Sequence, residues 1–246
     1  MSPEITRFYK ELTGSREWML HYIKFHNITR FTKITNNDVI LSELGQLFRR
    51  VILEDIPKIT RRNYSYKNSE KLLLRLAASD ELNLQALSQA LGISAEEINE
   101  TLDILEKAEL LNILLPYGGY DAKINKNKKA FFMSPSIRLA LLAQITEKEG
   151  YISKLYEDIV VMYLRRFFTN AILSFASRKN SKNPDFIIET LPEQLVLEVG
   201  TNKKSIKQLT VSNIKKRYGI LVNAEAETPS YEKDVLIVPL KWFLLL

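Results

Sequence analysis

The chain has 246 residues, a length that favours two compact domains because single hydrophobic cores grow inefficiently at this size. It has no cysteine, which excludes disulfides and cysteine-ligated zinc, and its 8 Gly and 8 Pro leave little room for long disordered tracts. The formal net charge of +6 is compatible with an acidic partner, of which nucleic acid is the commonest.

Neither a membrane span nor a signal peptide is visible. No apolar run approaches the roughly 20 residues that a transmembrane helix needs, and the first thirty residues carry charges throughout. Together with the absence of cysteine, this pattern leads us to expect a cytoplasmic protein with no membrane partner.

Apolar residues recur at helical spacing along the N-terminal part of the chain. They predict two short helices between residues 3 and 26, separated near Gly14, and a third helix over residues 36–56. Pro57 is expected to end that helix, since proline removes a backbone donor. We interpret residues 1–67 as a helical region.

The clearest local pattern follows. Residues 68–78 predict one helix, residues 83–91 a second, and Ser94 caps a third over residues 95–107. Strands are then predicted around a turn at Gly118 and Gly119. These elements predict a winged helix-turn-helix within residues 68–145. The last of the three helices is rich in Asp and Glu, so we do not expect it to read DNA bases.

The pattern of apolar residues changes near residue 146. A helix is predicted over residues 148–168, and residues 205–216 also read as helical. Short β-rich runs are predicted at residues 171–175, 185–188, 195–199, 220–222 and 235–238. Residues 146–246 therefore predict an α/β domain, and the chain as a whole a mixed α and α/β protein.

Two carboxylates occupy neighbouring predicted strands. Asp185 begins one strand, and Glu198 lies within the next, after three apolar residues. A carboxylate in an apolar strand is costly to bury unless it meets a metal or a partner, and two of them suit Mg²⁺ or Mn²⁺. The alternative is that Asp185 caps a turn while Glu198 faces solvent, as strict alternation along the strand predicts.

The sequence here resembles a known motif. Pro184-Asp185, a spacer of twelve residues and Glu198-Val199-Gly200 resemble the PD-(D/E)xK nuclease motif, which implies a restriction-endonuclease-like α/β domain. Glu157, on the preceding predicted helix, matches the acidic helical residue of many members. The resemblance therefore implies that Glu157, Asp185 and Glu198 are metal ligands.

A longer resemblance covers nearly the whole chain. The predicted winged helix, the stretch Lys129-Ala130-Phe131-Phe132-Met133-Ser134-Pro135-Ser136 and the ending Val238-Pro239-Leu240-Lys241-Trp242-Phe243-Leu244 resemble the C-terminal half of prokaryotic AAA-type ATPases. A phosphate-binding loop is absent from the sequence, so the chain is not expected to hydrolyse ATP by that route. It is then either a fragment without its motor or a stand-alone relative, with residues 1–67 matching the ATPase lid.

One position departs from the nuclease motif. The motif has a lysine two residues after the glutamate, where its ammonium stabilises charge in the transition state, and Gly200 stands there instead. Lys203, Lys204 or Lys207 can supply that charge from another backbone position, because a lysine side chain has long reach. We take Asp185, Glu198 and Lys203 as the candidate catalytic set. Otherwise the site is inactive.

Basic residues gather in two places that suit a DNA backbone, although each also fits an ordinary solvated surface. The candidate nucleic-acid contacts are Lys126, Lys128, Lys129, Lys204, Lys207, Lys215, Lys216 and Arg217.

The sequence thus favours the DNA-associated effector portion of an AAA-type ATPase, with a nuclease-like domain. The rival is a catalytically silent module that docks on an ATPase, on another partner protein or on a second copy of itself. Gly200 is the best support for the rival.

Overall fold

The computed structural model describes residues 3–60, 65–79, 81–119, 127–144, 150–176, 183–190, 193–201, 206–210, 214–216 and 218–246. It divides into two compact units, and each is built from separated stretches of chain. The helical unit comprises Tyr22–Leu114 and Asn127–Met162, and the strand unit comprises Met1–His21, Leu115–Lys126 and Tyr163–Leu246.

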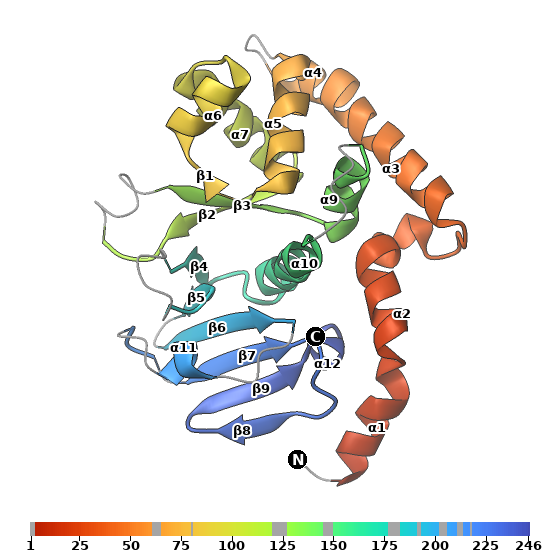
Figure 1. The fold of residues 1–246 in the computed structure, drawn as a ribbon, viewed down its shortest axis with the longest axis vertical. Coiled ribbons are helices and arrows are strands. Elements are labelled where there is room, and N and C mark those ends of the chain that lie inside the picture. The colour runs from red at the N-terminus through yellow and green to blue at the C-terminus, as the bar shows by residue number, and fades with distance from the viewer. Residues whose placement is uncertain are drawn as a thin grey trace. The chain divides into compact units, whose positions relative to one another are not determined.

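The helical unit begins with two short turns, η1 (Tyr22–His26) and η2 (Thr29–Phe31), and then a long helical stretch. That stretch is α3 (Asn37–Arg50), the π-helical turn η3 (Val51–Asp55) and α4 (Ile56–Ile59), which Figure 1 draws in orange. The side chain of Asn36 starts it by accepting from the backbone N–H groups of Asp38 and Val39.

The prediction that Pro57 ends this helix is wrong. Pro57 occupies the first turn of α4, and the chain stays helical to Ile59. The wide turn η3 is the physical reason. The N–H of Ile56 bonds back to the carbonyl of Val51, so a new first turn begins where proline's missing donor is not needed.

The three helices predicted between residues 68 and 107 are present. α5 (Tyr66–Ala78) is followed by α6 (Leu84–Leu91) and α7 (Ala95–Lys107). Gly92, at φ +70°, ends α6 in the left-handed region, and the Ser94 hydroxyl accepts from the N–H of Glu97 to start α7.

The predicted hairpin is also present. β2 (Leu111–Pro116) pairs antiparallel with β3 (Lys128–Phe132). A two-residue strand that the sequence did not predict, β1 (Glu81–Leu82), pairs with the outer side of β3. Two more helices follow, α9 (Pro135–Leu142) and α10 (Ile152–Phe167).

The strand unit is a mixed sheet. Its strands are β4 (Ile172–Phe175), β5 (Phe186–Glu189), β6 (Gln194–Gly200), β7 (Gly219–Asn223), β8 (Ser230–Glu232) and β9 (Val235–Pro239). β4, β5 and β6 form an antiparallel meander, whereas β6, β7 and β9 run side by side in one direction (Figure 1). β8 pairs antiparallel with β9. Leu115 and Pro116, at the end of β2, pair with β4.

The helix predicted over residues 205–216 is present only in part. α11 covers Lys207–Thr210, residues 214–216 are not helical, and residues 205 and 211–213 lie outside the described residues. Leu209 is buried in the core beside Gly219, with Ile206 and Ile214 packed on the same cluster. The unit also holds α1 (Pro3–Thr13), α2 (Arg16–His21) and the unpredicted α12 (Leu240–Phe243).

Each unit has its own core. In the helical unit, Phe48 and Ile52 pack in one cluster with Leu72, Leu102 and Phe132. Residues on both sides of position 67 thus share a core, and the division into segments 1–67, 68–145 and 146–246 stays a prediction. In the part of the chain that the structure describes, no helix is long and apolar enough to span a membrane.

Candidate functional site: a buried pair of carboxylates

Asp185 and Glu198 lie next to each other in the strand unit and hold each other through the backbone. The N–H of Asp185 donates to Oε2 of Glu198 at 3.0 Å. The N–H of Val199 donates to Oδ2 of Asp185 at 2.9 Å. Asp185 is 8% exposed and Glu198 1%. The two acids are therefore buried and fixed in orientation.

The sheet register explains this meeting. Phe186 pairs with Leu197, so the residue before β5 falls beside the residue after Leu197 on the antiparallel strand β6. β6 in turn lies between β5 and β7, and every residue from Leu195 to Gly200 is buried.

The alternative that Glu198 faces solvent is wrong. Alternation along a strand predicts a solvent-exposed side chain only where one face of the sheet is exposed to solvent. Both faces of β6 are covered, so Glu198 is buried as well. The Asp185 carboxylate accepts the N–H of Val199 on the neighbouring strand β6, so its role is not limited to capping a turn.

Two adjacent buried carboxylates favour a positively charged partner. Each anion loses hydration on burial, and like charges repel. A carboxylate has about four acceptor sites, so it can accept a backbone N–H and also coordinate a cation. Hard cations such as Mg²⁺ bind through one or two carboxylates and retain several waters. The donor set of Asp185 and Glu198 therefore fits a hard divalent cation.

Glu157 belongs to the other compact unit, on α10, where it is partly buried. Among the residues that the structure describes, no group of three or more His, Asp or Glu side chains is arranged to hold a metal ion. The structure thus brings together two of the three predicted ligands, and the participation of Glu157 stays a prediction.

The predicted basic residues are described only in part. Lys203, Lys204, Arg217 and Lys126 lie outside the described residues. Gly200, in the motif's lysine position, ends β6 and accepts from the N–H of Ala224.

Among the described lysines, Lys207 and Lys215 are exposed. Lys216 is partly buried, and this burial lowers the pKa of its ammonium. Lys128 and Lys129 are partly buried on β3, with the Lys129 ammonium 5.9 Å from the ring centre of Phe131.

The sequence reasoning missed a second buried acid. Asp158, next to Glu157, is fully buried in the helical unit and forms an ion pair with Arg138, whose Nε lies 2.6 Å from Oδ2. A signal was present, because Asp158 shares the helix face of Leu155, Ile159 and Met162, and an acid on an apolar face needs a partner.

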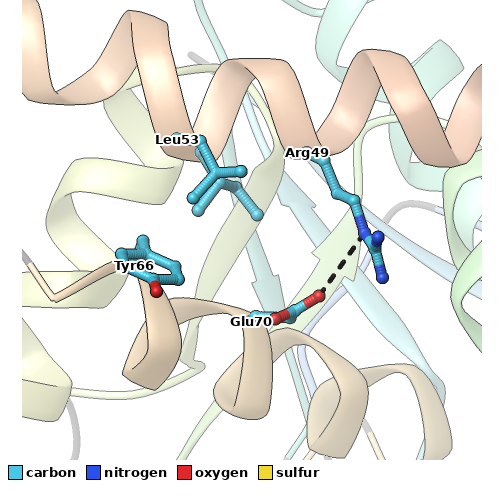
Figure 2. Close-up of a pocket in the computed structure, with 5 residues that line it drawn as sticks. Arg49, Leu53, Tyr66 and Glu70 are labelled. Atoms are coloured by element: carbon cyan, nitrogen blue, oxygen red, sulfur yellow. Dashed lines mark ion pairs between the residues drawn. The ribbon is translucent and has the colours of Figure 1, made fainter.

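The helical unit also contains a pocket of about 240 Å³. Figure 2 shows Arg49 and Leu53 of the α3 and η3 stretch extending toward Tyr66 and Glu70 of α5. Arg49 Nε and Glu70 Oε1 are 3.7 Å apart, and the buried Ile52 also lines the pocket.

Comparison with known proteins gives relatives without a described function. The model of a domain of unknown function, DUF8612, matches residues 31–149. An uncharacterized protein of Methanocaldococcus jannaschii, MJ1637, is 30% identical over 216 residues, which cover 84% of this chain. The chain spans only 45% of that relative's length. No solved structure matches the chain.

Proposed function

We propose that this chain is the DNA-associated effector part of an AAA-type ATPase, and that its strand unit is a nuclease-like domain that binds Mg²⁺ or Mn²⁺ at Asp185 and Glu198. The observation that carries the proposal is the buried pair of acids, each bonded to the backbone beside the other. Carboxylate oxygens held side by side are the ligands that hard cations such as Mg²⁺ prefer.

The order of elements around the pair supports the same proposal. A helix, three antiparallel strands, a helical turn and a strand parallel to the third occur as α10, β4, β5, β6, α11 and β7. This order resembles the core of the PD-(D/E)xK nucleases, in which the two acids likewise stand on the second and third strands.

The helical unit supports a role in positioning. The order α5, β1, α6, α7, β2 and β3 resembles a winged helix. More than half of the archaeal relative lies outside its match to this chain, which leaves room there for an ATPase module. The acidic α7, with Glu96 and Glu97 in its first turn, favours contact with backbone phosphates through other elements.

Each group at the proposed site has its own chemical role. A bound Mg²⁺ or Mn²⁺ supplies an activated water and neutralises charge on a phosphate. Asp185 and Glu198 supply carboxylate oxygens, and the N–H groups of Asp185 and Val199 hold those carboxylates in one orientation. Lys203, Lys204 or Lys207 is the candidate source of positive charge, and of these Lys207, exposed at the start of α11, lies in the described part of the chain.

The experiment titrates Mn²⁺ into the purified chain by calorimetry, beside Asp185→Asn and Glu198→Gln. Both variants keep the shape and the acceptor oxygen but remove a charge, so each should weaken Mn²⁺ binding at least tenfold. Glu189→Gln, at the far end of β5, is the matched control and should bind Mn²⁺ normally. Binding that survives both substitutions would exclude this metal site.

Cleavage is tested separately, with Mn²⁺ and supercoiled plasmid. The proposal expects any nicking to disappear in Asp185→Asn and Glu198→Gln and to persist in Glu189→Gln. Metal binding without nicking would mean a nuclease-like domain that is catalytically silent, as Gly200 favours.

The second candidate function is a protein-interaction module without metal or DNA. Gly200, in place of the motif's lysine, is the observation in its favour. Absence of both Mn²⁺ binding and DNA binding at low salt would select it.

A further inference from the structure

The three parallel strands of the strand unit end at one edge of the sheet. β6, β7 and β9 run in the same direction, and Gly200, Asn223 and Pro239 pair in register where these strands end. Figure 1 shows α12 beside this edge. Glu198 lies two residues before Gly200, on the same face of β6, so the acid pair is close to the edge. Ligands of open α/β sheets commonly bind beyond such carboxyl ends.

The connection from β7 to β8 begins against Gly200. The carbonyl of Gly200 accepts the N–H of Ala224. Oδ1 of Asn223 then accepts the N–H groups two and three residues further on, at 2.8 and 3.2 Å, so the chain turns directly after β7. Because β8 runs antiparallel to β9, it starts where β9 ends, and the whole connection stays at the carboxyl edge. Glu227 lies in this connection.

Lys241 places a largely buried ammonium at the same edge. It stands in α12, two residues after Pro239, and its side chain is 10% exposed. Its Nζ forms an ion pair with the carboxylate of Glu227, which is 69% exposed. Lysine is almost never buried this deeply unless it is paired. The ion pair therefore fixes the ammonium at the end of the sheet that holds the acid pair.

The described lysines between β6 and β7 lie toward the other ends of these strands. Lys207 begins α11, and Leu209 in the same turn packs on Gly219, the first residue of β7. Two further lysines precede β7 by a few residues. Figure 1 accordingly shows α11 near the starts of the strands and α12 near their ends. Lys241 is therefore better placed than Lys207 to serve a site at Glu198.

We propose that Lys241 binds a DNA phosphate beside the acid pair and supplies the positive charge that Gly200 does not. This inference rests on the proposed function of the strand unit. Gly200 and Pro239 are two strand spacings apart, which is about 10 Å, and the flexible four-carbon stem of lysine spans much of that distance. An ammonium in this place stabilises negative charge on the phosphate, as the motif's lysine does.

Glu227 is the counter-ion that DNA displaces. Its carboxylate is mostly exposed, so its release into water costs little, whereas the buried ammonium needs an anion beside it. A phosphate replaces one anion by another and keeps the ammonium paired. Glu227→Gln removes the competing charge, and this variant should bind duplex DNA roughly twofold to fivefold more tightly, as the strength of a partly exposed ion pair implies.

Fluorescence anisotropy of a labelled duplex, without divalent metal, tests the phosphate contact on the full chain. Lys241→Met keeps the apolar stem but removes the charge, so it should lower the salt slope of DNA binding by about 1, the effect of one lost phosphate contact. Lys241→Arg keeps the charge and should restore the slope, which separates lost charge from a disturbed fold. Lys233→Met, at a lysine 75% exposed in the turn before β9, is the matched control and should leave the slope unchanged. Equal slopes for Lys241→Met and Lys233→Met, or no DNA binding at the lowest salt, would overturn the inference.

Calorimetry with Mn²⁺ and plasmid nicking separate this inference from the metal site. Lys241→Met leaves both acids intact, so its Mn²⁺ affinity should be nearly that of the unmodified chain, while any nicking should fall by about tenfold or more. Normal Mn²⁺ binding with an unchanged salt slope would overturn the role of Lys241 alone. A larger fall in nicking for Lys207→Met than for Lys241→Met would assign the charge to Lys207 instead. If the unmodified chain binds no Mn²⁺, the proposed function fails and the inference fails with it.

Discussion

Arg138 and Asp158 form an ion pair in which both side chains are fully buried. Hydrogen bonds offset the desolvation cost of burying the two charges. Arg138 bonds both carboxylate oxygens of Asp158 and donates to the carbonyls of Leu76 and Ala77, and its guanidinium stands 4.8 Å from the ring centre of Phe132. Asp158 also accepts the N–H of Phe132. One pair thereby links α5, β3, α9 and α10.

Removing one partner of this pair should be severely destabilising. Arg138→Met leaves the Asp158 charge buried without its counter-ion, and we expect a loss of about 3–5 kcal/mol in the free energy of unfolding. Urea denaturation followed by circular dichroism measures it. Lys107→Ala, which removes an exposed ion pair with Asp103, is the control and should cost under about 1 kcal/mol.

The double variant Arg138→Met with Asp158→Leu separates charge from packing. It leaves no buried charge, so its loss should be clearly smaller than the sum of the two single losses. Additive losses would mean that the pair stabilises the unit mainly through the separate bonds of each residue.

At the scale of elements, two glycines in the helical unit have opposite requirements. Gly92 ends α6 at φ +70°, a conformation that side chains disfavour, whereas Gly45 lies inside α3 with ordinary helical geometry and open space around its Cα. Gly92→Ala should therefore lower the free energy of unfolding by about 1 kcal/mol. Gly45→Ala should raise it by about 0.5–1 kcal/mol, because alanine favours a helix.

Thermal melts of both variants, compared with the unmodified chain, check this pair of predictions. Since neither glycine has an atom within 4 Å of an added Cβ, the difference isolates the backbone from packing. Equal shifts in the same direction would contradict the prediction for one of the two glycines.

Local signals predicted the structure where one residue type determines the geometry, as at Ser94, which caps α7 as expected. They failed where packing decides. Nothing local distinguishes the wide turn η3 before Pro57 from an ordinary helix end.

The candidate site follows the same division. Asp185 and Glu198 could be paired from their strands and spacing, whereas the burial of Glu198 depends on β6 being an inner strand, between β5 and β7, with both faces covered, and these are long-range contacts. The pairing of Arg138 with Asp158 also joins distant positions, and only the position of Asp158 on an apolar helix face hinted at it.

At the scale of the whole molecule, the net charge of +6 and the two units raise one question, which is whether the basic residues act together on one partner. If the partner is DNA, each lysine that contacts a phosphate releases a counter-ion on binding. The logarithm of the association constant then falls with the logarithm of salt concentration, by about 0.9 for each phosphate contact. A protein partner that is bound through apolar surface gives no such slope.

Two exposed lysines of the strand unit, which also contains Asp185 and Glu198, allow this slope to be measured. We expect the double variant Lys207→Ala with Lys215→Ala to bind labelled duplex DNA more weakly and to lower the salt slope by about 2, as measured by fluorescence anisotropy between about 50 and 200 mM salt. Lys58→Ala with Lys107→Ala removes the same charge from lysines that face Asp55 and Asp103 on the helical unit, and should leave the slope nearly unchanged. Equal slopes for the two double variants would show that net charge alone attracts DNA, whereas no binding at the lowest salt would favour docking on a protein.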